Sequence, residues 1–275
     1  MGICTGQTSN ECPAFANTRT LVALKSNPIQ NSTNTMRTIL LTITFLLSLT
    51  TIFAQTQPKL KITPLSGDFY IYTTYSTYEG SPVPANGMYL VTNKGVVLFD
   101  TPWDTTQFQP LLDSIKIKHN KNVVLCLATH WHSDRTEGLA YYKQQGIKTY
   151  TTTLTDELSK KNNKKRAEYL IAKDTVFNVE QYSFETYYPG PGHSEDNIVI
   201  WFEKEKILYG GCLIKGADAQ NLGYLGDANV KEYYSTLKKV QAKCQLPKFI
   251  IISHSDWNNL NSLGHSIKLA RKLKK

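Results

Sequence analysis

The sequence has few cysteines, and after residue 55 it has no internal repeat and no long linker. Only Cys126, Cys212 and Cys244 follow residue 54, and an odd number of cysteines leaves at least one thiol unpaired. No cysteine directly follows Ala54, which argues against a lipid anchor at that point. The absence of repeats and linkers favours one domain, in a chain long enough for one large or two small domains.

Concentrated charge of one sign is also lacking. The formal net charge is +9, but the basic residues are scattered, and the densest cluster, residues 160–166, lies in one polar stretch. Such a run is usually a solvated surface, so we expect no nucleic-acid partner. Hydrophobic residues make up 41% of the chain, which is typical of a globular protein and argues against disorder.

The first 54 residues differ from the rest of the chain. Met36 and Arg37 precede an apolar run, Ile39 to Ile52, that ends before Ala54 and Gln55. This order is typical of a secretory signal peptide, and the run is too short for a confident membrane span. We therefore predict a signal peptide at 36–54, a globular domain at 55–275 and an exported, periplasmic protein. Residues 1–35 are interpreted as an upstream extension, with a disordered leader as the alternative.

Apolar periodicity indicates strands in the first half of the domain and alternating strands and helices afterwards. A helix is expected from Thr106 to Ile117, a second from about Thr136, and a basic helix at the end of the chain. The stretch Tyr75–Asn86 is rich in Gly, Pro and Ser, and we interpret it as a loop. This order predicts a mixed α and β domain whose sheets are covered by helices. The expected strands are Leu60–Ile62, Phe69–Thr74, Gly87–Val91, Val96–Asp100, Val123–Ala128, Ile207–Tyr209 and Phe249–Ile252.

Three metal-binding residue types stand within five positions after the expected strand Val123–Ala128. They are His130, His132 and Asp134. Imidazole and carboxylate are both good zinc ligands, and a strand that ends in a loop is a rigid platform for them. The pattern alone also occurs by chance in polar loops.

Three more candidate ligands also follow strand-like runs. His193 lies in a turn rich in Gly and Pro, Cys212 follows two glycines, and His254 follows a buried apolar run. His119 and His265 lie in polar, helical surroundings and are interpreted as surface residues, whereas Cys126 and Cys244 are interpreted as inert buried thiols.

Six candidate ligands exceed the four of one tetrahedral zinc. Two zinc ions with three protein ligands each would leave a position open for water, as in catalytic sites. A mixture of imidazole, carboxylate and thiolate favours zinc over magnesium or calcium. Use of Cys212 as a ligand would also account for an unpaired thiol in an exported protein.

These residues resemble the class B metallo-β-lactamases of the first subclass, most of all the flavobacterial chromosomal type. The resemblance covers roughly Leu60 to Leu273 and implies an α+β fold, the four-layer αββα sandwich. The motifs that carry it are Leu98–Trp103, Thr129–Arg135, Pro189–Asn197, Gly210–Lys215 and Leu222–Ala228.

The resemblance implies a division of the ligands between two zinc ions. His130, His132 and His193 would hold the first ion, and Asp134, Cys212 and His254 the second. An activated water would attack the lactam carbonyl without a covalent intermediate, and Asp134 would orient this water and help to move its proton.

The resemblance also implies roles for residues around the metals. Lys215 would bind the substrate carboxylate, and Asp100 and Arg135 would hold the ligands in place. The stretch Tyr75–Pro84 would be a mobile flap over the substrate. The sequence departs from the family at Tyr224, where many relatives carry an Asn implied to polarise the carbonyl. A phenol donor has a different reach, so we place Tyr224 only among the substrate-binding residues.

The implied function is zinc-dependent hydrolysis of penicillins, cephalosporins and carbapenems, which gives antibiotic resistance. We expect a monomer with a small-molecule substrate and no stable membrane anchor. The alternatives are a glyoxalase-type thioesterase, a nuclease of the same superfamily and a non-catalytic periplasmic zinc-binding protein. Arg135 argues against the first two, because those groups generally carry a metal-binding His directly after the Asp of the motif. Cys212 argues against the thioesterase, which carries a carboxylate there.

Overall fold

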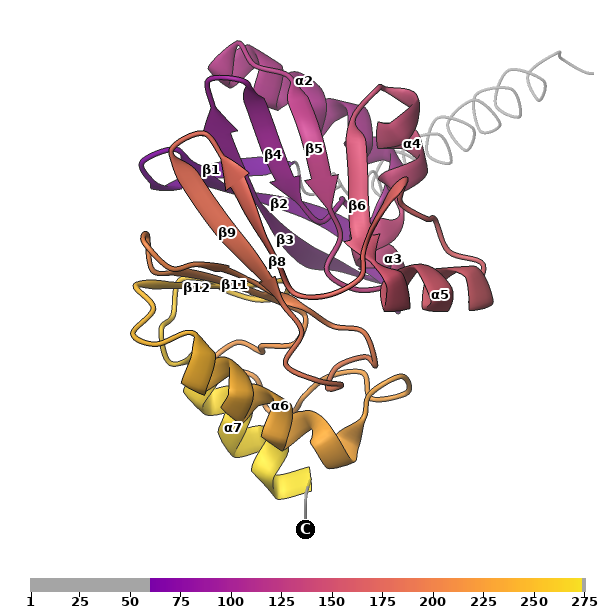
Figure 1. The fold of residues 1–275 in the computed structure, drawn as a ribbon. Coiled ribbons are helices and arrows are strands. Elements are labelled where there is room, and N and C mark those ends of the chain that lie inside the picture. Colours follow the sequence, from indigo (N-terminus) through magenta and orange to yellow (C-terminus); the bar gives the residue numbers. More distant parts are fainter. Residues whose placement is uncertain (1–59, 274–275) are drawn as a thin grey trace, which may run out of the picture. The chain divides into compact units, whose positions relative to one another are not determined.

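The computed structural model describes residues 60–273, which form two β-sheets packed face to face with helices on both outer faces (Figure 1). The segments interpreted as an extension and a signal peptide lie outside the described residues. The first sheet has seven strands in chain order. They are β1 (Lys61–Ser66), β2 (Phe69–Tyr78), β3 (Ser81–Thr92), β4 (Gly95–Phe99), β5 (Val123–Leu127), β6 (Lys148–Thr152) and β7 (Tyr169–Ile171).

The second sheet has five strands in the order β12-β11-β10-β9-β8. They are β8 (Thr175–Val179), β9 (Tyr182–Tyr187), β10 (Val199–Phe202), β11 (Ile207–Gly211) and β12 (Phe249–Ile252). In Figure 1, α2 (Phe108–His119) and α4 (Leu139–Gln144) lie outside the first sheet, and α6 (Val230–Lys243) and α7 (Ser262–Leu273) lie outside the second. The remaining helices are η1 (Thr105–Gln107), α3 (Ser133–Thr136) and α5 (Thr153–Lys161).

Three apolar clusters separate these four layers. One lies between α2, α4 and the first sheet, one between the two sheets, and one between the second sheet and the helices α6 and α7. The alternation of side chains along a strand explains how one strand serves two clusters. On β10, Val199 and Trp201 face α6 and α7, whereas Ile200 and Phe202 face the other sheet. The predicted αββα sandwich is confirmed.

The stretch Tyr75–Asn86 is not a loop, and that prediction is wrong. β2 and β3 continue through it as a hairpin, with Tyr78 opposite Ser81 and a two-residue turn at Glu79 and Gly80. Both turn residues have positive φ, as tight hairpin turns need. Pro82 and Pro84 are two residues apart on β3, in the part of the strand that precedes the residues paired with β4. No neighbouring strand therefore needs the N–H groups that prolines lack.

The directions of the strands bring the candidate ligands to one edge. β4, β5 and β6 are parallel, and so are β11 and β12. β9 has the same direction as β11, because both are antiparallel to β10. The carboxyl ends of parallel strands lie at one edge of a sheet, so the segments after β5, β9, β11 and β12 meet there. The helix expected from about Thr136 is instead a single turn, α3, followed by α4 from Leu139.

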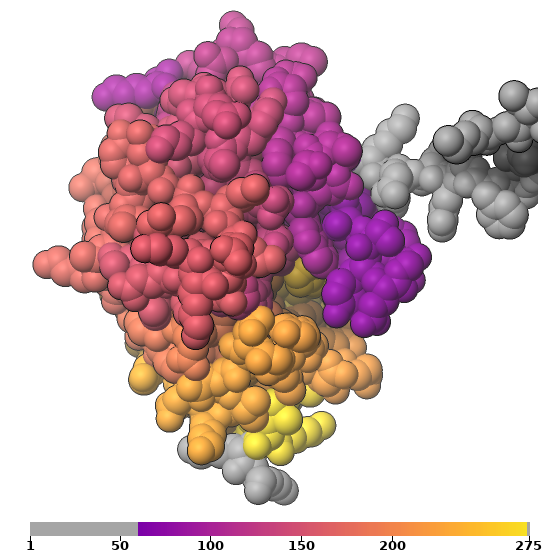
Figure 2. Space-filling model, turned by 90° about the vertical axis from the view of Figure 1, so that its right-hand side faces the viewer, coloured from indigo at the N-terminus to yellow at the C-terminus, as the bar shows by residue number. Residues whose placement is uncertain are grey.

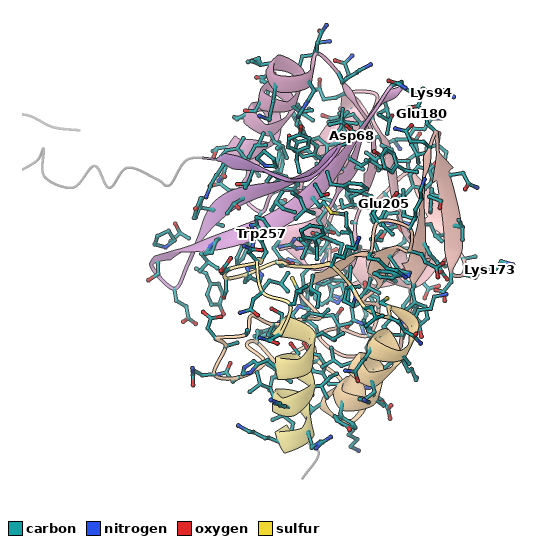
Figure 3. All side chains as sticks on the ribbon, turned by 90° about the vertical axis from the view of Figure 1, so that its left-hand side faces the viewer. Asp68, Lys94, Lys173, Glu180, Glu205 and Trp257 are labelled. Atoms are coloured by element: carbon teal, nitrogen blue, oxygen red, sulfur yellow. The ribbon has the colours of Figure 1, made fainter. Side chains whose placement is uncertain are left out.

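The opposite edge carries turns that tie the two sheets together. The Tyr182 hydroxyl donates to Asp68 (2.7 Å), and the Asn93 amide donates to Glu180 (2.6 Å). Figure 3 shows Lys94 and Glu180 beside each other, with Asp68 on the same side of Trp257, which lies three residues after the candidate ligand His254. Within residues 60–273, no helix is both long and apolar enough to cross a bilayer.

Candidate metal centre

Three histidines converge at the edge where the strands end. His130 and His132 follow β5, and His193 lies on the segment that follows β9. The Nε2 atom of His130 lies 3.2 Å from Nδ1 of His132, which in turn lies 3.1 Å from Nε2 of His193. Two nitrogens on one tetrahedral zinc are separated by about 3.3 Å, given Zn–N bonds of about 2.0–2.1 Å. The spacing of these three nitrogens therefore fits a zinc ion.

A second group lies beside the first. Asp134 is on α3, Cys212 directly follows β11, and His254 comes two residues after β12. Asp134 Oδ2 lies 3.2 Å from Cys212 Sγ and 3.1 Å from His254 Nε2, and the Sγ–Nε2 distance is 3.7 Å. These separations also suit a tetrahedral zinc, whose bonds to sulfur are about 2.3 Å. A thiolate in the set disfavours magnesium and calcium, which take oxygen ligands.

The two groups are close enough to act on one substrate. The potential ligand atoms of His130, His193 and Cys212 all lie within 4.8 Å of one another, as do those of His130, His132 and Asp134. The structure thus brings together all six residues predicted as metal ligands.

Hydrogen bonds orient two of the histidines. His132 Nε2 lies 3.1 Å from Asp227 Oδ2, and His254 Nδ1 lies 2.7 Å from the carbonyl oxygen of Pro84. A proton on each of these nitrogens leaves His132 Nδ1 and His254 Nε2 free to face a metal. Such partners fix the tautomer and ring orientation of a ligating histidine.

Arg135 is buried beneath the Cys212 group. Its guanidinium contacts Asp134 Oδ2 (3.0 Å) and Asp100 Oδ2 (3.3 Å), and both side chains are buried. Asp100 also accepts hydrogen bonds from the Thr129 amide (2.7 Å) and the Tyr209 hydroxyl (2.6 Å). Asp100 therefore contacts no candidate ligand itself, but holds Arg135 and the residue before His130.

The electrostatic states of the two groups differ. Burial lowers the pKa of His130 and of His193 well below the usual value, so both imidazoles are neutral and able to ligate. Burial alone would raise the pKa of Asp134, but Arg135 and His254 hold it well below its usual range. Burial alone would lower the pKa of His254, but Cys212 and Asp134 raise it to about 9. Even without a metal, the second group thus favours a positive charge, in the form of a proton on His254.

Lys215 and Tyr224 border the cluster. Lys215 is half-buried, and burial lowers the pKa of its amine against the opposing influence of Cys212 and Asp134. Tyr224 is 58% exposed, and its ring lies 6.4 Å from the His132 ring. A Cβ at Gly226 would lie 2.2 Å from the Tyr224 hydroxyl, so the phenol folds back over its own loop.

The surface is hollowed beside the β2–β3 hairpin. Figure 2 shows the hollow between the purple lobe that includes the β2–β3 hairpin and the orange surface below, with yellow atoms of the last part of the chain at its floor. Near its turn, the hairpin contacts the segment after β4, where the Tyr78 ring lies 6.1 Å from the Trp103 ring. At its base, the Gln107 side chain accepts from Tyr75 N (3.1 Å) and donates to Tyr75 O (2.5 Å).

Several residues that support the site were missed from the sequence. The sequence indicates no role for Asp227, Tyr209 or the Pro84 carbonyl, and it predicts a loop that ends at Asn86. Asp227 lies in the segment Leu222–Ala228, directly after Gly226. An acidic residue beside a glycine in this segment is the sequence signal that could have indicated its role. The partners of Tyr209 and Asn86 come from distant segments, and no local pattern indicates them.

Within residues 60–273, the remaining histidines and cysteines lie away from the cluster. Cys126 and Cys244 are buried and free, as expected. His119 and His265 are half-buried rather than plain surface residues. The His119 ring contacts Tyr70 and Tyr89, and His265 Nε2 lies 2.7 Å from the Ala219 carbonyl.

Residues 80–244 match the family model described as the metallo-beta-lactamase superfamily. A metallo-beta-lactamase type 2 from Elizabethkingia meningoseptica is 42% identical over 217 residues, which cover 79% of this chain and 87% of the relative. Metallo-beta-lactamase IND-1 from Chryseobacterium indologenes is 40% identical over 209 residues, which cover 76% of this chain and 87% of the relative.

Solved structures agree with these relatives. A metallo-beta-lactamase from Pontibacter korlensis superposes with a TM-score of 0.75 at 35% identity, covering 78% of this chain and 99% of the other. Metallo-beta-lactamase IND-7 superposes with a TM-score of 0.75 at 39% identity, covering 78% and 98%.

The raised pKa of His254 predicts how the stability of the metal-free protein depends on pH. A folded-state pKa of about 9 lies above the unfolded value of 6.5, so the charged imidazole stabilises the fold fully below pH 6.5. This contribution is lost as the pH rises through about 9. Urea unfolding of the chelator-treated protein should show a falling free energy of unfolding across this range. The decrease should be smaller in His254→Gln. If the free energy of unfolding fell equally with pH in both proteins, His254 would not be the residue responsible.

Proposed function

The chain belongs to the metallo-beta-lactamase superfamily, and we propose that it hydrolyses the amide bond of β-lactams with two zinc ions. The observation that carries this proposal is the convergence of six side chains, in two groups of three, at the edge where the strands end. His130, His132 and His193 would hold one ion, and Asp134, Cys212 and His254 the other. Zinc supplies a coordinated water of lowered pKa and polarises a carbonyl oxygen.

Asp134 serves both the metal and the reaction in this proposal. Its Oδ2 atom faces Cys212, His254 and Arg135. This leaves Oδ1 as the atom that can accept a hydrogen bond from the attacking water and take up its proton. Arg135 keeps the carboxylate ionised, which this role needs.

Lys215 is proposed to bind the substrate carboxylate. Its Nζ makes no ion pair within residues 60–273, and a Cβ at Gly223 would lie 3.9 Å from it. The ammonium therefore lies beside the loop that carries Tyr224, and Cys212 and Asp134 are close enough to raise its pKa. Ser266 on α7 fixes the Lys215 backbone by accepting from its amide (2.8 Å) and donating to its carbonyl (3.2 Å). A single free cation at this position suits an anionic substrate group.

Tyr224 is proposed as a wall of the substrate site rather than as a donor to the carbonyl. Its exposed ring stands edge-on to His132, whereas its hydroxyl is directed at Gly226. The Tyr78 ring, 47% exposed on the hairpin, is proposed to contact apolar groups of the substrate.

The pattern at residues 36–54 supports export, and the named relatives come from bacteria. We propose a periplasmic monomer that confers resistance to β-lactams, carbapenems included.

The function is tested directly with a carbapenem. The purified, zinc-loaded protein should remove the lactam absorbance of the carbapenem, a chelator should abolish this, and added zinc should restore it. Intact carbapenem after incubation would overturn the proposal. Hydrolysis of a glutathione thioester by the same sample would then support the thioesterase, and zinc binding without either activity would support a non-catalytic zinc protein.

The substitution Lys215→Gln tests the carboxylate contact. Loss of a charge-assisted hydrogen bond, worth about 1.5–3 kcal/mol, should raise KM for a penicillin about 10- to 100-fold. Zinc content should stay unchanged. Lys204→Gln is the matched control, because Lys204 is exposed on the turn between β10 and β11 at the opposite edge. Equal KM values for Lys215→Gln and the unmodified protein would rule out this role.

A further inference from the structure

The outer half of the β2–β3 hairpin is a two-stranded ribbon. β1 pairs with β2 as far as Thr73, and β4 pairs with β3 only from Met88 onwards. Within residues 60–273, no third strand therefore pairs with residues 74–87 on either side. A hairpin of two strands is only marginally stable in water on its own. This ribbon must therefore be held by contacts from outside its sheet.

Gln107 holds one side of the ribbon. Its Oε1 accepts from the Tyr75 amide (3.1 Å), and its Nε2 donates to the Tyr75 carbonyl (2.5 Å). The side-chain amide thus takes the place of a peptide group on a neighbouring strand, because it bonds to both backbone groups of one residue. Pro84 lies opposite Tyr75, and its carbonyl oxygen lies 2.7 Å from His254 Nδ1. One residue pair of the ribbon is consequently held from both sides.

Gln107 itself stands on a fixed part of the chain. It ends the short helix η1, and its backbone amide donates to the Asp104 carbonyl (3.0 Å). Asp104 Oδ1 in turn accepts from the Thr106 amide (2.8 Å) and hydroxyl (2.7 Å). The residue after Gln107 is Phe108, which is buried in the apolar cluster between α2, α4 and the first sheet. A side chain on such a support can hold another segment in one position.

The tip of the hairpin, residues 77–82, is exposed. It contacts the same support through the rings of Tyr78 and Trp103, whose centroids lie 6.1 Å apart. Within residues 60–273, the two bonds between Tyr75 and Gln107 are the last hydrogen bonds that β2 makes outside the hairpin before this tip. Loss of these bonds would leave β2 joined to the support by an exposed ring pair.

We infer that Gln107 is a positioning residue, which sets how closely the hairpin and the Tyr78 ring stand over the substrate site. This inference rests on the proposed function, in which Tyr78 contacts apolar groups of the substrate. While Tyr75 is bonded to Gln107, the Tyr78 ring stays beside Trp103. A released ribbon also adopts positions in which Tyr78 no longer reaches the substrate. Gln107 therefore determines how well substrates with a large apolar side chain bind.

Hydrogen exchange tests the attachment. Gln107→Ala removes both hydrogen bonds, so the amides of Tyr75 and residues 76–83 should exchange about 10- to 100-fold faster. Gln107→Glu keeps the acceptor and loses the donor, so exchange at Tyr75 should be intermediate. Gln109→Ala is the matched control and should leave exchange unchanged, because Gln109 is exposed and bonds to Asp113 (2.6 Å) instead of the hairpin.

The effect on binding is measured with two substrates. In zinc-loaded Gln107→Ala, KM for a penicillin with a benzyl side chain should rise about 3- to 10-fold at unchanged kcat. The reason is that apparent affinity falls with the fraction of protein in the binding-competent conformation. KM for a carbapenem with a small side chain should change less, and zinc content should stay the same.

Unchanged exchange at Tyr75 in Gln107→Ala would overturn the inference. An unchanged KM for the benzyl penicillin in a variant whose hairpin exchanges faster would also overturn it. Faster exchange throughout the domain, or loss of zinc, would indicate a merely structural role for Gln107 and would count against the inference equally. If the unmodified protein hydrolysed neither β-lactam, the proposed function would be refuted and the substrate role of Gln107 with it, whatever the exchange of the hairpin shows.

Discussion

The buried guanidinium of Arg135 is the interaction on which the rest of the site depends. It joins the carboxylates of Asp134 and Asp100 and the backbone of Asn86, and the Tyr209 hydroxyl lies beside it at 3.4 Å. These partners belong to both sheets. A buried cation is tolerated only when its charge is compensated, and loss of one partner of such a pair costs about 3–5 kcal/mol. The two sheets therefore pack correctly only when Asp134 and Asp100 compensate the charge of Arg135. This placement of Asp134 is also the one that the Asp134–Cys212–His254 group needs.

The two groups of candidate ligands are prepared in different ways. Burial keeps His130 and His193 neutral, so these two residues present uncharged imidazoles. The second group holds Asp134 as an anion and attracts a proton to His254, which a metal would have to displace. Arg135 and the half-buried Lys215 limit the negative charge there. The three-histidine group is consequently the more self-contained, and the Cys212 group depends more on charged neighbours such as Arg135.

The sequence predicts those features of the site that depend on residues close together in the chain. The ends of apolar runs marked the positions of His130, Cys212 and His254, and the family motifs indicated the αββα sandwich. The sequence does not indicate the hairpin, because Pro82 and Pro84 are typical of loops, and only the pairing of β3 shows that their N–H groups are not needed. The roles of Asn86 and Tyr209 depend on contacts between segments more than 100 residues apart, which no spacing pattern contains. The family motifs include the segment that contains Asp227, but only the folded structure shows its contact with His132.

The most direct test is a crystal structure of the zinc-loaded protein with anomalous scattering recorded at the zinc edge. We expect two zinc peaks, one bound by His130 Nε2, His132 Nδ1 and His193 Nε2, and the other by Asp134, Cys212 and His254. A single peak shared by His130, His193 and Cys212, whose potential ligand atoms also lie within 4.8 Å of one another, would contradict this division of the ligands.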